Sequence, residues 1–293
     1  MPTSSNKPLV LYLQGGLGNQ LFQYHAALNF STKKNMKLIV SKSGYFNGKY
    51  PSEILKQRIK PDIFNLYSFE TSKEDLPNLT EIYRYRLIKR FYNSLRQRNL
   101  VLDEGNYMEQ LDSEFTKVKY IMGYFESNEF MPDRSMLQPI RKRLRETSEL
   151  HMASYPTNFL AVHIRLGDLA KQGRVYIPSW EYFVNAIHRL RTIVGNYPVM
   201  IFSDDCEEVM KSYSQLLKEK DVAFAKKGSP SQHLHAMSCA KGLVCSNSTL
   251  SWWAVRLSDD SSNVIIPSRY LMLDNNLQES QRFWERDHER IPG

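Results

Sequence analysis

Hydrophobic and polar positions follow two patterns at the start of the chain, one typical of a strand and one typical of a helix. Pro8–Leu13 is a short apolar run typical of a strand, and glycines at 15, 16 and 18 interrupt it. Four apolar residues then recur at helical spacing, namely Leu21, Tyr24, Ala27 and Leu28, before a second strand pattern at Lys37–Val40. The pattern predicts a strand, a glycine turn, a helix and a strand. The amides at the helix N-terminus would face whatever lies over the turn.

The second half of the chain has a more regular pattern. Five short apolar runs follow one another: Phe159–Ile164, Val199–Phe202, Val222–Phe224, Leu243–Cys245 and Val264–Ile266. Helical patterns such as Trp180–Val194 and Glu207–Lys218 separate them. This alternation predicts a doubly wound, parallel α/β sheet. Ligands of such sheets bind beyond the carboxyl ends of the strands, so the residues after each run are the candidates for chemistry.

Between these regions, one helical stripe near residues 82–95 is surrounded by basic side chains from Arg84 to Arg98. We favour a solvated basic face on a helix packed against the core; the alternative is peripheral contact of the Arg84–Arg98 helix with an anionic membrane. The net charge of +8 favours an anionic partner. This partner could be a nucleic acid, a membrane surface or a phosphorylated small molecule.

Length and composition fit two domains, which we place at 1–150 and 151–293. No window approaches the run of about 20 apolar residues that spans a bilayer, and no apolar signal core precedes Leu9, so a cytoplasmic location is expected. The three cysteines, Cys206, Cys239 and Cys245, lack C-x-x-C spacing, which favours reduced thiols.

The strongest candidate residues follow the first run of the second half, in His163-Ile-Arg-Leu-Gly-Asp168. His163 and Arg165 are two apart in a strand and therefore share a face, and Gly167 lets the chain turn so that Asp168 comes back towards them. Arg165 suits two phosphate oxygens because its charged fork binds them together. The alternative is an ion pair between Arg165 and Asp168 that only closes a loop.

Polar residues also follow two later runs. Ser203, Asp204 and Asp205 come after the second, where helix capping explains most of them, and one aspartate could accept hydrogen bonds from a base or sugar. Ser246, Ser248 and Thr249 come after the fourth, where hydroxyls beside free helix amides suit phosphate oxygens; serine capping is the alternative. No D-x-D triplet occurs, and His233, His235 and Cys239 fit no standard zinc spacing, so no metal is expected.

Five motifs in order resemble the α-1,2-fucosyltransferase family: G-G-L-G-N-Q-L-F-Q-Y, G-Y-F-E-S, H-I-R-L-G-D, F-S-D-D and S-N-S-T-L-S-W-W-A. The resemblance covers about residues 9–270. It implies a fold of the GT-B type, with two facing Rossmann-like domains and the donor cleft between them. Residues 1–150 would be the acceptor-side domain, and 151–293 would bind GDP-β-L-fucose.

The resemblance also implies an inverting transfer of L-fucose to the 2-hydroxyl of a galactose in a glycan, as in O-antigen or oligosaccharide biosynthesis. GDP-fucose and a galactose-terminated acceptor would be the partners, without cofactor, metal or nucleic acid. Arg165, Asn19 and Asp168 would be catalytic. The donor-binding residues would be Gly16, Gly18, Gln20, His163, Arg165, Ser203, Asp204, Ser246, Ser248 and Thr249.

The chain departs from the family pattern at two positions. Leu166 stands where the family more often has a second arginine, and His233 stands where an aspartate commonly holds guanine. A neutral imidazole offers one acceptor and cannot pair with two guanine N–H groups as a carboxylate does. The general base stays unassigned among Glu126, Asp168 and Asp204, or Asn19 only orients the acceptor hydroxyl in a dissociative reaction.

Two other functions compete with this interpretation. One is a fucosyltransferase that forms another linkage or modifies protein hydroxyls. The other is a non-catalytic nucleotide or nucleic-acid binder, which the basic balance of the chain and the Arg84–Arg98 helix support.

Overall fold

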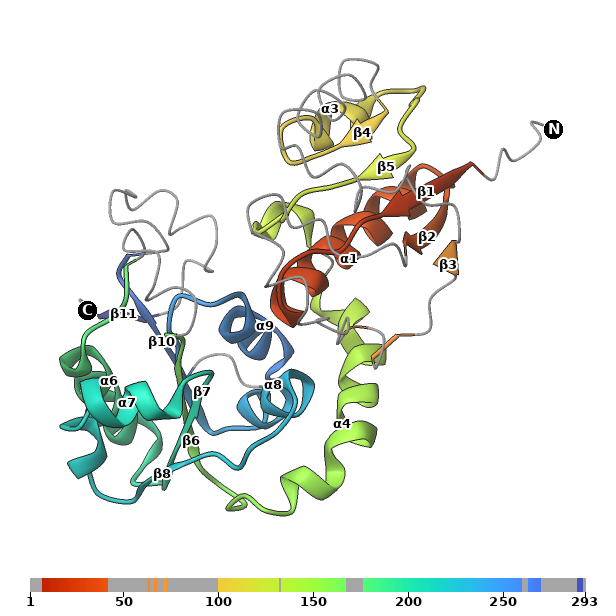
Figure 1. Ribbon diagram of the computed structural model, residues 1–293. Coiled ribbons are helices and arrows are strands. Elements are labelled where there is room, and N and C mark those ends of the chain that lie inside the picture. The colour runs from red at the N-terminus through yellow and green to blue at the C-terminus, as the bar shows by residue number, and fades with distance from the viewer. Residues whose placement is uncertain are drawn as a thin grey trace. The chain divides into compact units, whose positions relative to one another are not determined.

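The computed structural model describes residues 7–41, 63, 66–67, 71–72, 100–131, 133–166, 176–259, 263–269 and 289–291 (Figure 1). The chain divides into two compact units, Met1–Pro132 and Asp133–Gly293. The predicted boundary after residue 150 falls inside helix α4 (Gln138–Met152), which packs against α8 (Pro230–Ser238) of the second unit.

The first unit contains a parallel sheet with the strand order β3-β2-β1-β5-β4. The strands are β1 (Pro8–Leu11), β2 (Lys37–Ser41), β3 (Thr71–Ser72), β4 (Val101–Leu102) and β5 (Tyr120–Ile121). Helix α1 (Leu17–Lys33) connects β1 to β2 and packs against both strands. The predicted strand, turn, helix and strand at the start of the chain are therefore confirmed.

Aromatic rings fill the core of the first unit beside α1. Tyr107 begins helix α3 (Tyr107–Asp112), and Phe130 ends the short helix η3 (Asn128–Phe130). The Tyr107 ring contacts the rings of Phe30, Phe125 and Phe130, with centroids 4.8–5.8 Å apart. Its hydroxyl donates to the Ala26 carbonyl across 3.0 Å, which satisfies a polar group that would otherwise be buried without a partner.

The turn between β1 and α1 depends on one glycine conformation and two buried glutamines. Gly15 has φ +73°, the left-handed region. The Gln20 amide donates to the Gly15 carbonyl across 2.9 Å. Gln23 holds the backbone of Gln14 at both ends, accepting from its N–H at 2.9 Å and donating to its carbonyl at 3.0 Å. These bonds from α1 hold the preceding turn in one conformation.

The second unit contains a six-stranded parallel sheet with the order β11-β10-β9-β6-β7-β8. Its strands are β6 (Leu160–Ile164), β7 (Val199–Ser203), β8 (Val222–Phe224), β9 (Gly242–Val244), β10 (Val264–Pro267) and β11 (Glu289–Ile291). The chain moves outward from β6 to β8, returns to β9 beside β6, and moves outward the other way. This is the doubly wound order, and its switch point lies between β6 and β9.

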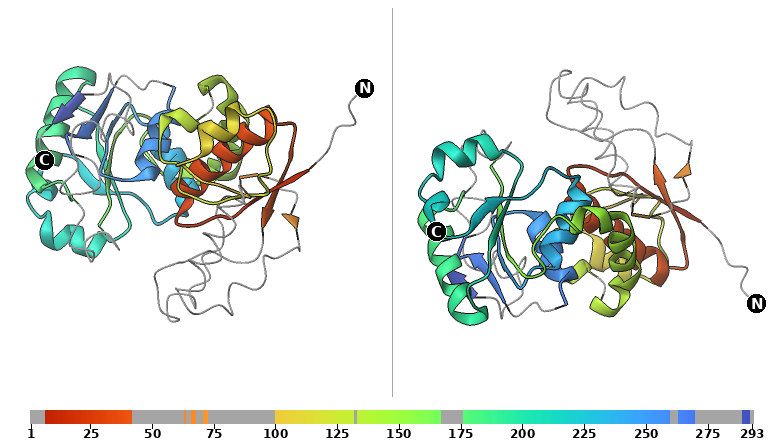
Figure 2. Two further views of the ribbon diagram at one scale, coloured as in Figure 1. Left: turned by 90° about the horizontal axis from the view of Figure 1, so that it is seen from above. Right: turned by 90° about the horizontal axis from the view of Figure 1, so that it is seen from below.

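Helices cover both faces of this second sheet (Figure 2). Helices α6 (Trp180–Val194) and α7 (Cys206–Ser212) lie on one face, and α8 and α9 (Thr249–Leu257) lie on the other. Short helices η4 (Arg134–Leu137) and η5 (Leu216–Lys218) complete the described elements. The five predicted runs form β6 to β10, so the predicted parallel α/β sheet is confirmed.

Strand β6 divides its side chains between the two faces. Leu160, Val162 and Ile164 join the core beneath α6 and α7. His163 points the other way and contacts Ser251 of α9. The alternation of a strand therefore buries one set of side chains and presents the other set towards α9.

The Arg84–Arg98 helix lies outside the described residues. Across the part of the chain that the structure describes, no helix is long and apolar enough to cross a membrane.

The glycine turn yields a test of backbone conformation. We expect Gly15→Ala to lower the free energy of unfolding by about 1–2 kcal/mol, because alanine is strained at positive φ. Its Cβ would also lie 2.5 Å from Asn19 Nδ2, so the Asn19 side chain must move. Gly16→Ala is the matched control: its Cβ would meet nothing within 4 Å, and the loss should stay below about 1 kcal/mol. Urea unfolding measures both, and equal losses would contradict this account.

Candidate functional site

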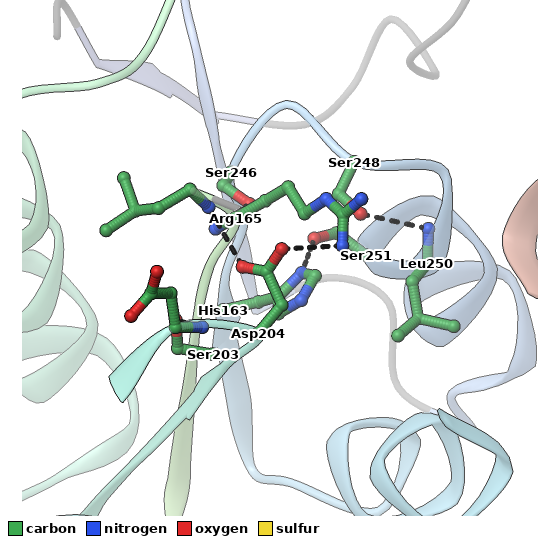
Figure 3. A network of polar contacts seen from close by, with 10 residues as sticks. His163, Arg165, Ser203, Asp204, Ser246, Ser248, Leu250 and Ser251 are labelled. Carbon is green, nitrogen blue, oxygen red and sulfur yellow. Dashed lines mark hydrogen bonds and ion pairs between the residues drawn. The ribbon is translucent and has the colours of Figure 1, made fainter. Parts of the chain in front are cut away.

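Polar side chains gather at the carboxyl ends of β6, β7 and β9, at the switch point of the second sheet (Figure 3). Arg165 follows β6 and Ser246 lies just beyond β9. The Arg165 backbone N–H donates to Ser246 Oγ across 3.2 Å, which joins the two strand ends. Ser246 is 1% exposed. The position is the one at which open α/β sheets bind their ligands.

Asp204 holds both the Arg165 side chain and the backbone beside it. Arg165 Nη1 and Asp204 Oδ2 are 2.7 Å apart, and the Leu166 N–H donates to Asp204 Oδ1 across 3.0 Å. Strands β6 and β7 pair in register up to Ile164 and Ser203, so the residues that follow meet. The sequence suggested Asp168 as the ion-pair partner. The described partner is Asp204, and Asp168 itself lies outside the described residues.

The Arg165–Asp204 pair is accessible to a ligand. The Arg165 side chain is 35% exposed and that of Asp204 is 25% exposed. A guanidinium has five donors in a planar fork, so pairing with one carboxylate is compatible with binding an anion. At this exposure the pair itself adds little stability. The geometry therefore orients a cation at the strand ends.

His163 is buried and uncharged. Its Nδ1 lies 2.5 Å from Ser251 Oγ, and the residue is 5% exposed. Burial is the main cause that lowers its pKa from 6.5 to about 3, and the positive charge of Arg165 and the electrostatic interaction with His233 add to it. A ring with this pKa is not a proton donor at neutral pH. It connects the end of β6 to α9.

The N-terminus of α9 is the second polar element of the site. Ser248 is its N-cap, and its Oγ accepts from the Leu250 N–H across 3.2 Å. Thr249 is the first helical residue. Capping by serine is thus observed, and it leaves a helix N-terminus beside Arg165, where the amide dipoles favour an anion (Figure 3). Trp252 and Trp253 are buried.

At the end of β7, the polar residues close the strand-to-helix turn. The Asp205 N–H donates to Ser203 Oγ across 3.1 Å, and Asp205 caps α7 by accepting from the Glu208 N–H at 3.0 Å. Ser203 therefore shapes the turn that presents Asp204 to Arg165.

His233 supports a loop of the second unit. Its Nε2 lies 3.0 Å from the Lys226 carbonyl oxygen, and its ring packs against Phe202 with centroids 5.4 Å apart. A carbonyl oxygen only accepts, so Nε2 carries the proton and Nδ1 is the acceptor of the neutral ring. Burial lowers the pKa of His233 and of its neighbour His151. One acceptor nitrogen is therefore what this position offers to a ligand.

The four candidate residues of the first unit differ in exposure. Gly16 is exposed and Asn19 is partly exposed, whereas Gly18 and Gln20 are buried. Gln20 also accepts from the Ile63 N–H across 3.3 Å, besides its bond to Gly15. In this structure Gln20 serves the turn, and Gly16 and Asn19 are the residues that the turn presents to solvent.

Sequence patterns missed the roles of Gln23 and Asn247 and the buried partner of Ser251. Ser251 belongs to the quoted serine-rich motif, but its partner His163 is 88 residues away. Gln23 looked like an ordinary helical position. Asn247 is 2% exposed and donates to the Tyr176 carbonyl across 2.9 Å. Among the described residues, no group of three or more histidine, cysteine or acidic side chains could hold a metal.

The class of protein that this fold and site define is a parallel α/β protein with a site for an anionic ligand at its strand ends. The sequence profile of glycosyl transferase family 11 matches residues 9–285. The chain therefore belongs to glycosyl transferase family 11, the α-1,2-fucosyltransferase family that the motifs indicated.

Two relatives from Escherichia coli match nearly the whole chain. The alpha-1,2-colitosyltransferase is 25% identical over 271 residues, which cover 88% of this chain and 90% of the relative. The O-antigen biosynthesis glycosyltransferase WbnK is 26% identical over 289 residues, covering 90% and 95%. The family and these relatives make the protein a glycosyltransferase.

Two solved structures share the fold. The NodZ α-1,6-fucosyltransferase soaked with GDP-fucose has a TM-score of 0.52 and 15% identity, covering 87% of this chain and 93% of its own. POFUT1 in complex with GDP has a TM-score of 0.52 and 14% identity, covering 90% and 99%.

The buried His163 predicts a pH dependence of stability. Its pKa in the folded protein, about 3, is below the ordinary 6.5, so the unfolded chain binds more protons between these values and stability falls as the pH drops from 6.5 towards 3. His163→Gln should make this fall shallower by up to about 1.4 kcal/mol per pH unit. Urea unfolding of both proteins between pH 7.5 and 4.5 measures it. The other histidines are common to both proteins, and parallel curves would rule out the burial of a neutral ring.

Proposed function

We propose that the protein transfers L-fucose from GDP-β-L-fucose to the 2-hydroxyl of a galactose, with inversion, forming an α-1,2 linkage without a metal. The observation that carries the proposal is the position of Arg165 beside the N-terminus of α9, at the switch point of the second sheet in a family 11 chain. The acceptor galactose would belong to a glycan, as the O-antigen role in the name of one relative suggests.

Arg165 would stabilise the departing GDP. Cleavage of the bond between fucose and phosphate develops negative charge on the diphosphate, so a fixed cation stabilises the transition state more than the ground state. Asp204 orients the guanidinium before the donor arrives. Ser246, Ser248 and Thr249 would bind pyrophosphate oxygens, with the α9 amides adding their dipoles.

His163 would position this site as a neutral group. Because its ring is uncharged, it holds Ser251 without adding a second cation beside Arg165. Its role is to keep the end of β6 in place against α9. Leu166 stands where the family motif would place a second arginine, so Arg165 would act on the β-phosphate alone.

The first unit would complete the site in a two-domain arrangement of the GT-B type. Gly16 allows close approach of the donor, and Asn19 would contact the fucose or its phosphate. Gly18 and Gln20 would act indirectly through the turn, since both are buried.

The general base lies among fewer candidates than the sequence left open. Asp204 already uses one oxygen for Arg165 and the other for the Leu166 N–H, so it is poorly suited to take a proton from the acceptor. Glu126 and Asp168 remain. For guanine, Nδ1 of His233 would accept one N–H of the base.

A second candidate is colitosyl transfer in the same linkage, because one relative is named an alpha-1,2-colitosyltransferase. Colitose is L-fucose without its 3-hydroxyl, so the nucleotide parts of both donors would bind in the same way. The two candidates differ only in whether the site recognises that hydroxyl.

The test of function is transfer from GDP-fucose and GDP-colitose to a panel of galactosides, followed by linkage analysis of the products. We expect fucose on O2 of galactose. Preferential use of GDP-colitose would support the second candidate, and a linkage other than to O2 would refute both.

Arg165→Ala should reduce turnover by roughly 100- to 1,000-fold while the protein stays folded, the effect seen when one donor to a developing anion is removed. Arg189→Ala is the matched control, because Arg189 on α6 also pairs with a carboxylate, Glu289, but away from the site. Steady-state kinetics and circular dichroism measure activity and fold. Near-normal turnover in a folded Arg165→Ala protein would refute the assignment.

A further inference from the structure

The turn after β5 has a backbone conformation that needs an explanation. Phe125 has φ +54°, which is rare for a bulky residue and concentrates at functional positions. Its ring is fully buried and contacts Tyr107 and Phe130. The preceding residue, Tyr124, is 46% exposed. The conformation thus buries one aromatic ring and presents the next one to solvent.

Glu104, beyond the end of β4, holds this turn. Its Oε1 accepts from the N–H of Phe125 across 2.8 Å and also from the N–H of Tyr124. The carboxylate lies directly against Gly123, where an added Cβ would come within 2.5 Å of Oε2. One oxygen therefore fixes two consecutive amides, and the direction of Tyr124 is set by backbone contacts.

The turn lies at the ligand edge of the first sheet. Strands β1 and β5 are parallel neighbours, and the Tyr12 N–H donates to the Ile121 carbonyl across 3.2 Å. The turn with Tyr124 and the turn with Gly16 and Asn19 therefore follow the carboxyl ends of adjacent strands (Figure 1). In parallel sheets this edge is where ligands bind.

We propose that Tyr124 is a stacking platform for the pyranose ring of the acceptor sugar, with Glu104 as its positioning residue. This rests on the proposed function, which supplies a galactoside as the acceptor. The axial 4-hydroxyl of galactose leaves C–H groups together on one face of the ring, and an aromatic side chain offers that face a rigid apolar surface. Glu126, two residues further on, places a carboxylate on the same turn, as binding sites for polar ligands combine apolar surface with a few polar groups.

The first experiment measures acceptor binding separately from transfer. Methyl β-D-galactopyranoside is titrated by NMR into protein saturated with GDP, and the KM of the same acceptor is measured with GDP-fucose. Tyr124→Ala should raise both the dissociation constant and the KM roughly tenfold, whereas GDP affinity by calorimetry should not change. Tyr124→Phe keeps the ring and should stay within about twofold of the wild type.

Phe115→Ala is the matched control. Phe115 is 82% exposed, but it precedes β5 and so lies towards the opposite end of that strand. This variant should bind the galactoside as the wild type does. A loss equal to that of Tyr124→Ala would overturn the proposal.

Glu104 is tested by a pair of variants. Glu104→Ala removes the acceptor of two amides and should raise the acceptor KM with little change in GDP affinity. Glu104→Gln retains an Oε1 and should restore most of the binding. If both behave alike, the positioning role is wrong.

The outcomes separate the two proposals. Galactoside binding that depends on Tyr124, without fucose transfer, would support the platform and refute the proposed function. Fucose transfer with an unchanged KM in Tyr124→Ala would refute the platform alone. A wild-type protein that does not bind the galactoside would overturn both.

Discussion

The in-register pairing of β6 with β7 and β9 is the constraint on which the site depends. Each of these strands is short. β6 and β7 end level with each other, at Ile164 and Ser203, and β9 ends at Val244, which pairs with Val162. A guanidinium, a carboxylate and a serine hydroxyl that are distant in sequence therefore meet at one edge. The strands themselves are held by the apolar layer beneath α6 and α7. Packing on one face of the sheet thus positions polar chemistry at its end.

The electrostatics of the second unit follow from unequal burial at this edge. The Arg165 side chain stays partly exposed, while His163, two residues earlier, is buried so far that its pKa falls to about 3. Partial burial also lowers the pKa of His151 and His233. The result is an oriented guanidinium beside a buried, neutral imidazole. A negatively charged ligand would be attracted towards this guanidinium, which favours one binding geometry.

Much of this architecture could be predicted from periodicity, because buried strands and amphipathic helices leave regular signatures. The runs that became β6 to β10 were predicted, as was the placement of Arg165, Asp204 and Ser246 after strand ends. The pairing of Arg165 with Asp204 could not be predicted, since hydrophobic periodicity does not indicate the order of strands in a sheet. The bonds of Gln20 and Gln23 were also hidden, because a buried amide that satisfies a turn has no sequence spacing of its own. Glu104 was missed because the backbone amides that it accepts from are distant in sequence, at Tyr124 and Phe125.

The alternation of β6 has a consequence for how this protein can change over generations. Ile164 belongs to the core and His163 to the polar side, one residue apart on opposite faces. Inserting or deleting a single residue within the strand would exchange the two sets, turning aliphatic side chains towards α9 and moving His163 into the apolar core. We therefore expect length variation in the loops only. The number of residues between the apolar run and Arg165 cannot change without disrupting the strand.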